Sequence, residues 1–136
     1  MIAVITGATS GFGKAIAEKF AEEGYSLIIT GRRNELLTQV AQTIKQKNAV
    51  DVLPLNFDVR DKHAVSQHLS DLPEQWRQID VLVNNAGLAL GKDYFDEADM
   101  NDWETMIDTN VKGMLYVSRA VIPYMSERKK GHIVRK

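Results

Sequence analysis

Cysteine is absent from the 136-residue chain, as are long apolar runs and any surplus of one charge. Without cysteine the chain can form no disulfide bond, thiolate zinc site or cysteine nucleophile. No apolar run approaches the roughly 18 residues that a membrane span needs, and no signal-peptide pattern opens the sequence. The 17 basic and 18 acidic residues form no basic patch, which argues against nucleic acid or a membrane surface as partner. These absences predict a soluble, cytoplasmic protein.

Histidine is scarce as well, and its placement argues against a metal site. His63, His68 and His132 do not stand at i, i+4 spacing, and no repeated carboxylate pattern accompanies them. We therefore predict no bound metal. The 136 residues have the length of one domain, spanning 1–136, but are short for a complete doubly wound enzyme.

A glycine-rich turn follows the first apolar run, residues 2–5, and leads into the helical apolar spacing of residues 16–21. A strand, a glycine turn and a helix make a phosphate-binding geometry, because unpaired N–H groups and the helix dipole favour an anion there. The spacing matches neither G-x-G-x-x-G nor a P-loop, and a purely structural turn fits the residues equally well. If the turn binds phosphate, we expect contacts from Gly7, Ala8, Thr9, Ser10, Gly11, Phe12 and Gly13.

Two arginines follow the second predicted strand, residues 26–30, after a helix that we expect to end at Gly24. In dinucleotide-binding folds an acid at this strand tip binds the ribose of NAD, whereas an arginine accommodates the 2′-phosphate of NADP. Here Arg32 and Arg33 occupy the tip, which favours NADP, and the Ser10 hydroxyl could bind the same phosphate. The alternative is a pair of solvated arginines at a helix start.

A third strand is predicted at residues 50–57, after a helix capped by Asn34. At its end Asp58 could accept from an adenine amino group, cap the following helix, or both. The fourth strand, 79–84, is almost continuously apolar, as in parallel strands covered on both faces. It ends at Asn84, Asn85, Ala86 and Gly87, at the edge where open α/β sheets bind ligands.

A surface loop is predicted over residues 88–100, and Asp102 is expected to cap a long helix with apolar residues at three- and four-residue steps. Asn110 lies inside this helix, where asparagine is unfavourable because its amide competes with the backbone. A solvated amide and a functional one are both compatible with this position. Pro123 is expected to bend or end the helix, and residues 131–134 to begin a fifth strand.

Together these motifs resemble the short-chain dehydrogenase/reductase family over the whole chain. The resemblance is carried by Thr6-Gly7-xxx-Gly11-x-Gly13, Asp58, Asn84-Asn85-Ala86-Gly87 and Asn110. Residues 88–91, 102–110 and 131–134 are more narrowly similar to the NADP-dependent serine and 3-hydroxy-acid dehydrogenases. The family implies an α/β, Rossmann-like doubly wound parallel sheet of strand order 3-2-1-4-5. It also implies hydride transfer between NADP(H) and a small 3-hydroxy acid, or serine-like alcohol, or its carbonyl.

The resemblance also implies roles for individual residues. It assigns cofactor contacts to residues 7–13 and to Arg32, Arg33, Asp58, Val59, Asn85, Ala86 and Gly87. It assigns Asn110 the support of a proton relay through a water molecule. The family's serine would align two positions beyond Lys136, with Tyr-xxx-Lys after it, and none of the four tyrosines here has a lysine four residues on.

We therefore expect an incomplete NADP-binding domain that lacks the family's last strands and is inactive alone. Full-length members are expected to be homo-oligomers, an expectation that does not extend to a chain without their second interface helix. The alternative functions are a non-catalytic NADP-binding module and a subunit completed by another chain. A flavodoxin-like regulatory domain is disfavoured, because three glycines and an arginine pair suit a dinucleotide better than FMN.

Overall fold

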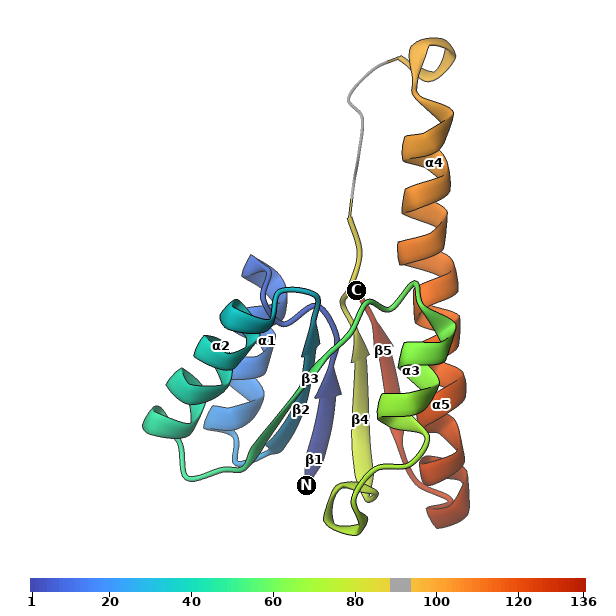
Figure 1. The fold of residues 1–136 in the computed structure, drawn as a ribbon. Helices are drawn as coiled ribbons and strands as arrows, with labels where there is room; N and C mark the ends of the chain where they lie inside the picture. The colour runs from blue at the N-terminus through green and yellow to red at the C-terminus, as the bar shows by residue number, and fades with distance from the viewer. Residues whose placement is uncertain (89–93) are drawn as a thin grey trace.

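A five-stranded parallel sheet ordered β3-β2-β1-β4-β5 forms the centre of the computed structural model, which describes residues 1–88 and 94–136 (Figure 1). This order confirms the predicted Rossmann-like topology. The strands are β1 (Ile2–Ile5), β2 (Ser26–Gly31), β3 (Val52–Asn56), β4 (Ile79–Asn84) and β5 (His132–Arg135). Because every neighbouring pair is parallel, the carboxyl ends of all five strands lie along one edge of the sheet.

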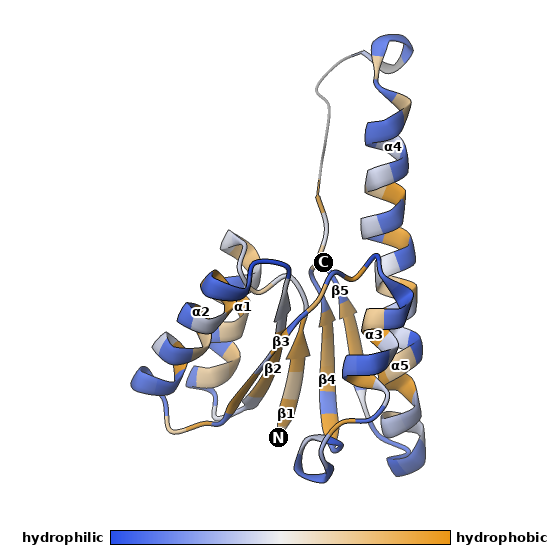
Figure 2. Ribbon diagram, viewed as in Figure 1, coloured by the Kyte–Doolittle hydropathy of each residue, from blue (hydrophilic) through white to orange (hydrophobic). Residues whose placement is uncertain are grey.

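Helices cover both faces of the sheet. The helices α1 (Gly11–Glu22) and α2 (Asn34–Lys47) lie on one face, and α3 (Lys62–Leu69) and α5 (Gly113–Arg128) lie on the other (Figure 1). In β1, Ala3 and Ile5 pack into the core cluster of α1 and α2, whereas Val4 packs into that of α3 and α5. The central strands are therefore mostly apolar, whereas the helices combine hydrophilic and hydrophobic residues (Figure 2).

The two edge strands differ from the central ones. β3 is shorter than the predicted run of residues 50–57 and contains Pro54, which an edge strand tolerates because a missing N–H there costs little. β5 forms the other edge, as predicted, and all four of its residues are exposed. Its apolar members Ile133 and Val134 are each 41% exposed.

The long helix begins earlier and continues further than predicted. It consists of α4 (Met100–Ile107), a π-helical turn (Asp108–Lys112) and α5, in one continuous rod (Figure 1). Asp99, not Asp102, caps it, because the Asp99 carboxylate accepts from the N–H of Asn101 at 2.8 Å. Pro123 lies inside α5 without ending it. Pro123 is on the exposed side, where water can satisfy the carbonyl that proline leaves unpaired.

The predicted cap at Asn34 is wrong, and so is the alternative role of Asp58 as a cap. Asn34 is the first residue of α2, and the capping position is held by Arg33 without a side-chain bond. Asp61, not Asp58, caps α3, accepting from the N–H groups of His63 and Ala64 at 3.1 Å each. Gly24 does end α1, with a φ of 89° that glycine adopts without strain.

Part of the predicted surface loop of residues 88–100, including Asp93, lies outside the described residues. A short 3₁₀ turn, Phe95–Glu97, precedes α4, and another, Glu74–Trp76, precedes β4. The upper part of the α4–α5 rod extends beyond the carboxyl edge of the sheet (Figure 1). No helix within 1–88 or 94–136 has both the length and the apolar character that crossing a membrane requires.

Candidate functional site

The glycine-rich turn connects the carboxyl end of β1 to α1 and packs tightly against the segment after β4. Gly7 has a φ of 65°, and a Cβ there would lie 2.8 Å from the Cα of Ala86. A Cβ on Gly13 would collide with the carbonyl oxygen of Gly7 and would lie 2.5 Å from the Asn85 side-chain nitrogen. At these two positions glycine is required by the protein's own packing.

Thr6 and Asn85 join the two segments. The Thr6 hydroxyl oxygen accepts from the N–H groups of Asn85 at 3.1 Å and Ala86 at 2.9 Å. In return the Asn85 amide donates to the carbonyls of Thr6 at 3.2 Å and Gly7 at 3.1 Å. Asn85, predicted as a cofactor contact, thus holds the glycine turn in place. Sequence reasoning gave Thr6 no role of its own, although its position directly before Gly7 was the available signal.

The outer part of the turn is open. Apart from its chain neighbours and its own helix turn, nothing in residues 1–88 or 94–136 lies within 4 Å of where a Cβ on Gly11 would stand. Gly11 opens α1, whose first N–H groups have no partner within the helix. Phe12 is 67% exposed, and the Lys136 ammonium lies 3.8 Å from the centroid of its ring. The Ser10 hydroxyl donates to the Gly7 carbonyl at 2.9 Å, so it stabilises the turn rather than reaching toward Arg32. This surface can accept an anion.

A cavity of about 60 Å³ lies beside the turn, at the carboxyl ends of β2 and β3. Arg32, Asp58 and Arg60 line it, with Gly7, Thr9, Thr30, Gly31, Phe57, Val59, Ala86 and Thr109. The hydroxyls of Thr30 and Thr109 are buried here and have no hydrogen-bond partner among the described residues. Six of the fourteen predicted cofactor residues, from distant parts of the chain, therefore line this one opening, next to two buried hydroxyls.

Asp58 faces this cavity but is already engaged. Burial on its own would raise the pKa of Asp58, but hydrogen bonds from the side chain and backbone of Arg60, with attraction from Arg60 and Arg32, lower it below its ordinary value. A negative Asp58 surrounded by arginines keeps the local charge positive.

Asn110 lies in the π-helical turn and clamps the chain after β4. Its side-chain oxygen accepts from the Leu88 N–H and its side-chain nitrogen donates to the Leu88 carbonyl, both at 2.8 Å. A Cβ on Gly87 would lie 2.8 Å from the Asn110 oxygen, which explains glycine at that position. Because both polar atoms of the Asn110 amide are paired with backbone, the solvated-amide alternative is wrong. The expected relay role stays a prediction.

A second cavity, about 310 Å³, opens between the Asn110 clamp and the end of β5. Its lining consists of residues 84–88 with Asn110, Met114, Arg135 and Lys136. It lies on the same sheet edge as the glycine turn, because its lining residues are at the carboxyl ends of β4 and β5. There the backbone N–H of Lys136 donates to the Asn84 carbonyl at 3.2 Å.

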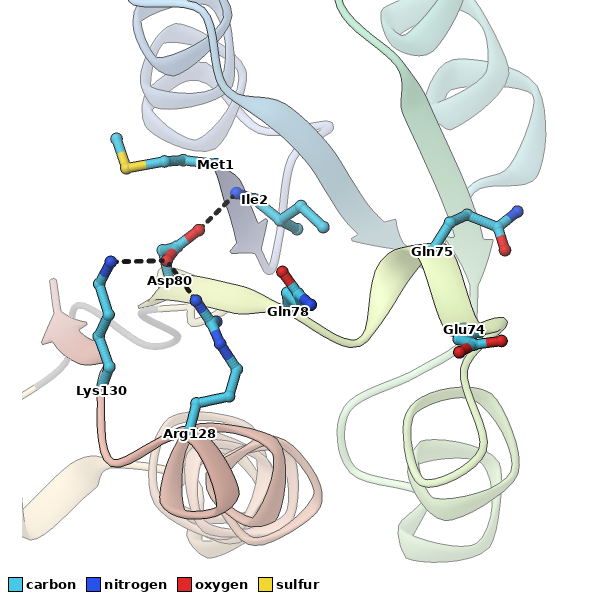
Figure 3. Close-up of a pocket in the computed structure, with 8 residues that line it drawn as sticks. All are labelled: Met1, Ile2, Glu74, Gln75, Gln78, Asp80, Arg128 and Lys130. Atoms are coloured by element: carbon cyan, nitrogen blue, oxygen red, sulfur yellow. Dashed lines mark hydrogen bonds and ion pairs between the residues drawn. The ribbon is translucent and has the colours of Figure 1, made fainter.

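A larger cavity, about 680 Å³, lies at the opposite end of the strands, around Asp80 (Figure 3). Asp80 accepts from the Ile2 N–H at 2.9 Å and pairs with Arg128 at 3.2 Å and Lys130 at 3.9 Å. Because all these groups satisfy one another, we interpret the cluster as a structural link between β1, β4 and the end of α5. The predicted site residues lie elsewhere.

Comparison with known proteins agrees with this geometry. The family model described as short chain dehydrogenase matches residues 1–135. The chain belongs to the short-chain dehydrogenase family.

The chain is 52% identical over 134 residues to an NADP-dependent 3-hydroxy acid dehydrogenase, YdfG, of Salmonella typhi, covering 98% of this chain and 52% of that protein. It is 51% identical over 126 residues to sulfoacetaldehyde reductase 2 of Chromohalobacter salexigens, covering 93% and 49%. The crystal structure of serine dehydrogenase from Escherichia coli superposes with a TM-score of 0.92 at 46% identity, covering 99% of this chain and 61% of that one. The chain thus spans about half the length of these curated short-chain dehydrogenase relatives.

Proposed function

We propose that this chain is the coenzyme-binding part of an NADP-dependent oxidoreductase. The reaction would transfer hydride between NADP(H) and a small 3-hydroxy acid, or serine-like alcohol, or its carbonyl. The observation that carries the proposal is the open N-terminal turn of α1 at Gly11, on the same sheet edge as Arg32, which lines the cavity beside it. Two relatives support it, since YdfG is named NADP-dependent and a closed serine dehydrogenase, 47% identical with a TM-score of 0.89, is complexed with NADP⁺.

The residues present fit the coenzyme. The helix-start N–H groups at residues 11–13 suit a diphosphate, because they carry partial positive charge and have no helical partner. Arg32 and Arg33 suit a 2′-phosphate, and the cavity beside Asp58 and Val59 suits an adenine. Gly7, Ala8, Thr9, Asn85, Ala86 and Gly87 would shape the surface between the two. Bound coenzyme supplies the hydride, and these side chains bind and orient it.

The proton chemistry is not provided by residues 1–136. A group that exchanges a proton near neutral pH must titrate there, whereas tyrosine has an ordinary pKa of about 10. Residues 1–136 contain no Tyr-xxx-Lys that could shift it. We therefore expect these residues to bind NADP(H) weakly and to show no turnover alone. Hydride transfer to a 3-hydroxy acid by this chain alone would contradict that expectation.

The substrate class rests on likeness alone. The two relatives are almost equally identical to this chain, yet their names give different substrates, a 3-hydroxy acid and sulfoacetaldehyde. Both substrates are small and carry an oxygen at a carbon that hydride transfer can reduce or oxidise. The 3-hydroxy acid is favoured because serine is itself a 3-hydroxy acid, and the serine dehydrogenase structures share the same fold at 46–47% identity.

Removing the arginine pair tests the coenzyme assignment. The double variant Arg32→Ala with Arg33→Ala should weaken NADP⁺ binding by about 1.5–3 kcal/mol, the range for hydrogen bonds to charged groups, and change NAD⁺ binding little. Isothermal titration of both coenzymes against the chain measures this difference. Arg119→Ala, an exposed arginine on α5, is the matched control and should change neither. Equal losses for the two coenzymes would contradict a 2′-phosphate contact.

A second candidate is a non-catalytic NADP-binding module or a subunit completed by another chain. The exposed edge of β5 favours it, together with the exposed apolar side chains of Ile107, Leu115 and Ile122 on the long helix rod. Such surfaces invite association. Light scattering after size exclusion should then show a concentration-dependent oligomer, which Leu115→Lys with Ile122→Lys disperses. A monomer at all concentrations would show that these surfaces do not join copies of this chain.

A further inference from the structure

A row of alternating charges crosses the carboxyl edge of the sheet beside the proposed adenosine site. At its centre Arg60 binds Asp58: its Nε lies 3.1 Å from each carboxylate oxygen and its Nη2 lies 2.7 Å from Oδ2. The backbone N–H of Arg60 adds a bond of 2.9 Å to Oδ1. Both oxygens of this carboxylate are therefore filled by one residue.

The charges continue on both sides of this pair. Arg32 lines the same cavity and lies close enough to attract the Asp58 carboxylate. On the other side Asp108 attracts the Arg60 guanidinium, and Lys112 pairs with Asp108 at 3.0 Å. Within the described parts of the chain Arg32 makes no ion pair of its own, whereas Asp58 pairs with Arg60 at 2.7 Å.

Two arginines thus compete for one carboxylate, and the geometry gives it to Arg60. If Arg60 were removed, Asp58 would be left with two unfilled oxygens and a full negative charge at the cavity. The Arg32 side chain, exposed and long, is the other cation that attracts this carboxylate and could turn to satisfy its oxygens. A carboxylate held by Arg32 would also repel an incoming phosphate.

We propose that Arg60 is a positioning residue for 2′-phosphate selectivity: by occupying Asp58 it leaves the Arg32 guanidinium free for the phosphate and neutralises the carboxylate that would oppose it. This inference rests on the proposed NADP binding. It assigns different tasks to Arg32 and Arg60: Arg32 binds the 2′-phosphate, and Arg60 keeps Arg32 from pairing with Asp58.

Nucleotide binding to the 136-residue chain tests the inference with 2′,5′-ADP and 5′-AMP as probes. Arg60→Met should weaken 2′,5′-ADP by about tenfold, the low end for a charged hydrogen bond, with little change for 5′-AMP. Arg60→Lys keeps the charge without the guanidinium fork and should recover part of the loss. Arg119→Met serves as the control, and thermal unfolding of each variant separates a folding defect from a lost preference.

Combination with Arg32→Met distinguishes positioning from direct contact. If Arg60 acts through Arg32, Arg60→Met should reduce the affinity for 2′,5′-ADP much less in the Arg32→Met background than in the original chain. Additive losses, or an unchanged ratio of the two affinities in Arg60→Met, would overturn the inference.

A ligand-free measurement keeps the inference separate from the proposed function. Carboxyl-carbon NMR titration of Asp58 should show that Arg32→Met raises the Asp58 pKa more in the Arg60→Met background than in the original chain, because Arg32 has moved onto the carboxylate. An equal change in both backgrounds would overturn the inference by itself. If the original chain binds 2′,5′-ADP no better than 5′-AMP, the proposed function fails instead, whatever this titration shows.

Discussion

At the scale of the residue, two glycines of the first turn differ in the reason for glycine, which is packing at one position and a ligand at the other. The sequence alone does not show this difference. Gly13 is glycine because a Cβ would strike the Gly7 carbonyl, whereas Gly11 has open space around it. Any need for glycine at position 11 must therefore come from a ligand. The two positions provide a matched pair for mutation.

Gly13→Ala should destabilise the chain by about 1–3 kcal/mol, the usual cost of overpacking, because the Gly7 carbonyl and Asn85 would have to move. Gly11→Ala should leave stability nearly unchanged and weaken NADP⁺ binding, since its methyl group would stand where the diphosphate is proposed to lie. Chemical unfolding and coenzyme titration of both variants measure the two effects. Unchanged coenzyme affinity in Gly11→Ala would mean that the turn is only structural.

At the scale of the element, the π-helical turn places Asn110 against the segment that leaves β4. The backbone of Leu88 has its N–H and its carbonyl both satisfied by this one side chain. The clamp joins the long helix rod to the wall of the 310 Å³ cavity. The position of that wall thus depends on an asparagine that helical propensity alone would disfavour.

Asn110→Ala should lower the free energy of unfolding by about 1–3 kcal/mol, because it leaves two backbone groups of Leu88 without partners. The amide of Leu88 should lose protection in hydrogen exchange measured by NMR, while amides of β1 keep theirs. Asn101→Ala, an exposed asparagine in the first turn of α4, is the control. Wild-type protection at Leu88 in the Asn110 variant would show that the clamp is not needed to hold this segment.

At the scale of the whole molecule, Asp80 connects Ile2, near the start of the chain, to Arg128 and Lys130, at and after the end of α5. The pairing of β1 with β4 skips Asp80, and the Ile2 N–H bonds to its carboxylate in place of a backbone carbonyl. Burial alone would raise the pKa of Asp80, but the bond from Ile2 and the charges of Arg128 and Lys130 lower it (Figure 3). A charge inside a nearly continuous apolar run thus has a structural reason.

The lowered pKa of Asp80 predicts an acid-sensitive fold. Because the folded pKa lies below the unfolded value, about 3.9 for aspartate, the stabilisation is complete above that value and is lost as pH falls through the folded pKa. Asp80→Asn should reduce stability at neutral pH and flatten its decline in acid, as urea unfolding at a series of pH values would show. Asp71→Asn, whose side chain is 90% exposed, is the control. An unaltered acid limb in Asp80→Asn would contradict the link.

The sequence by itself determined the elements and their order, because strand and helix periodicity, the glycine turn and the stop at Gly24 depend on local sterics and on burial of apolar faces. Arg32, Asp58 and Asn85 could be assigned to one sheet edge because parallel strands bring their carboxyl ends together. Only the tertiary structure decided which polar groups pair. The Asn85 amide, for example, binds a turn 78 residues away. Such choices depend on distances in space, and residues far apart in sequence acquire those distances only when the sheet has formed.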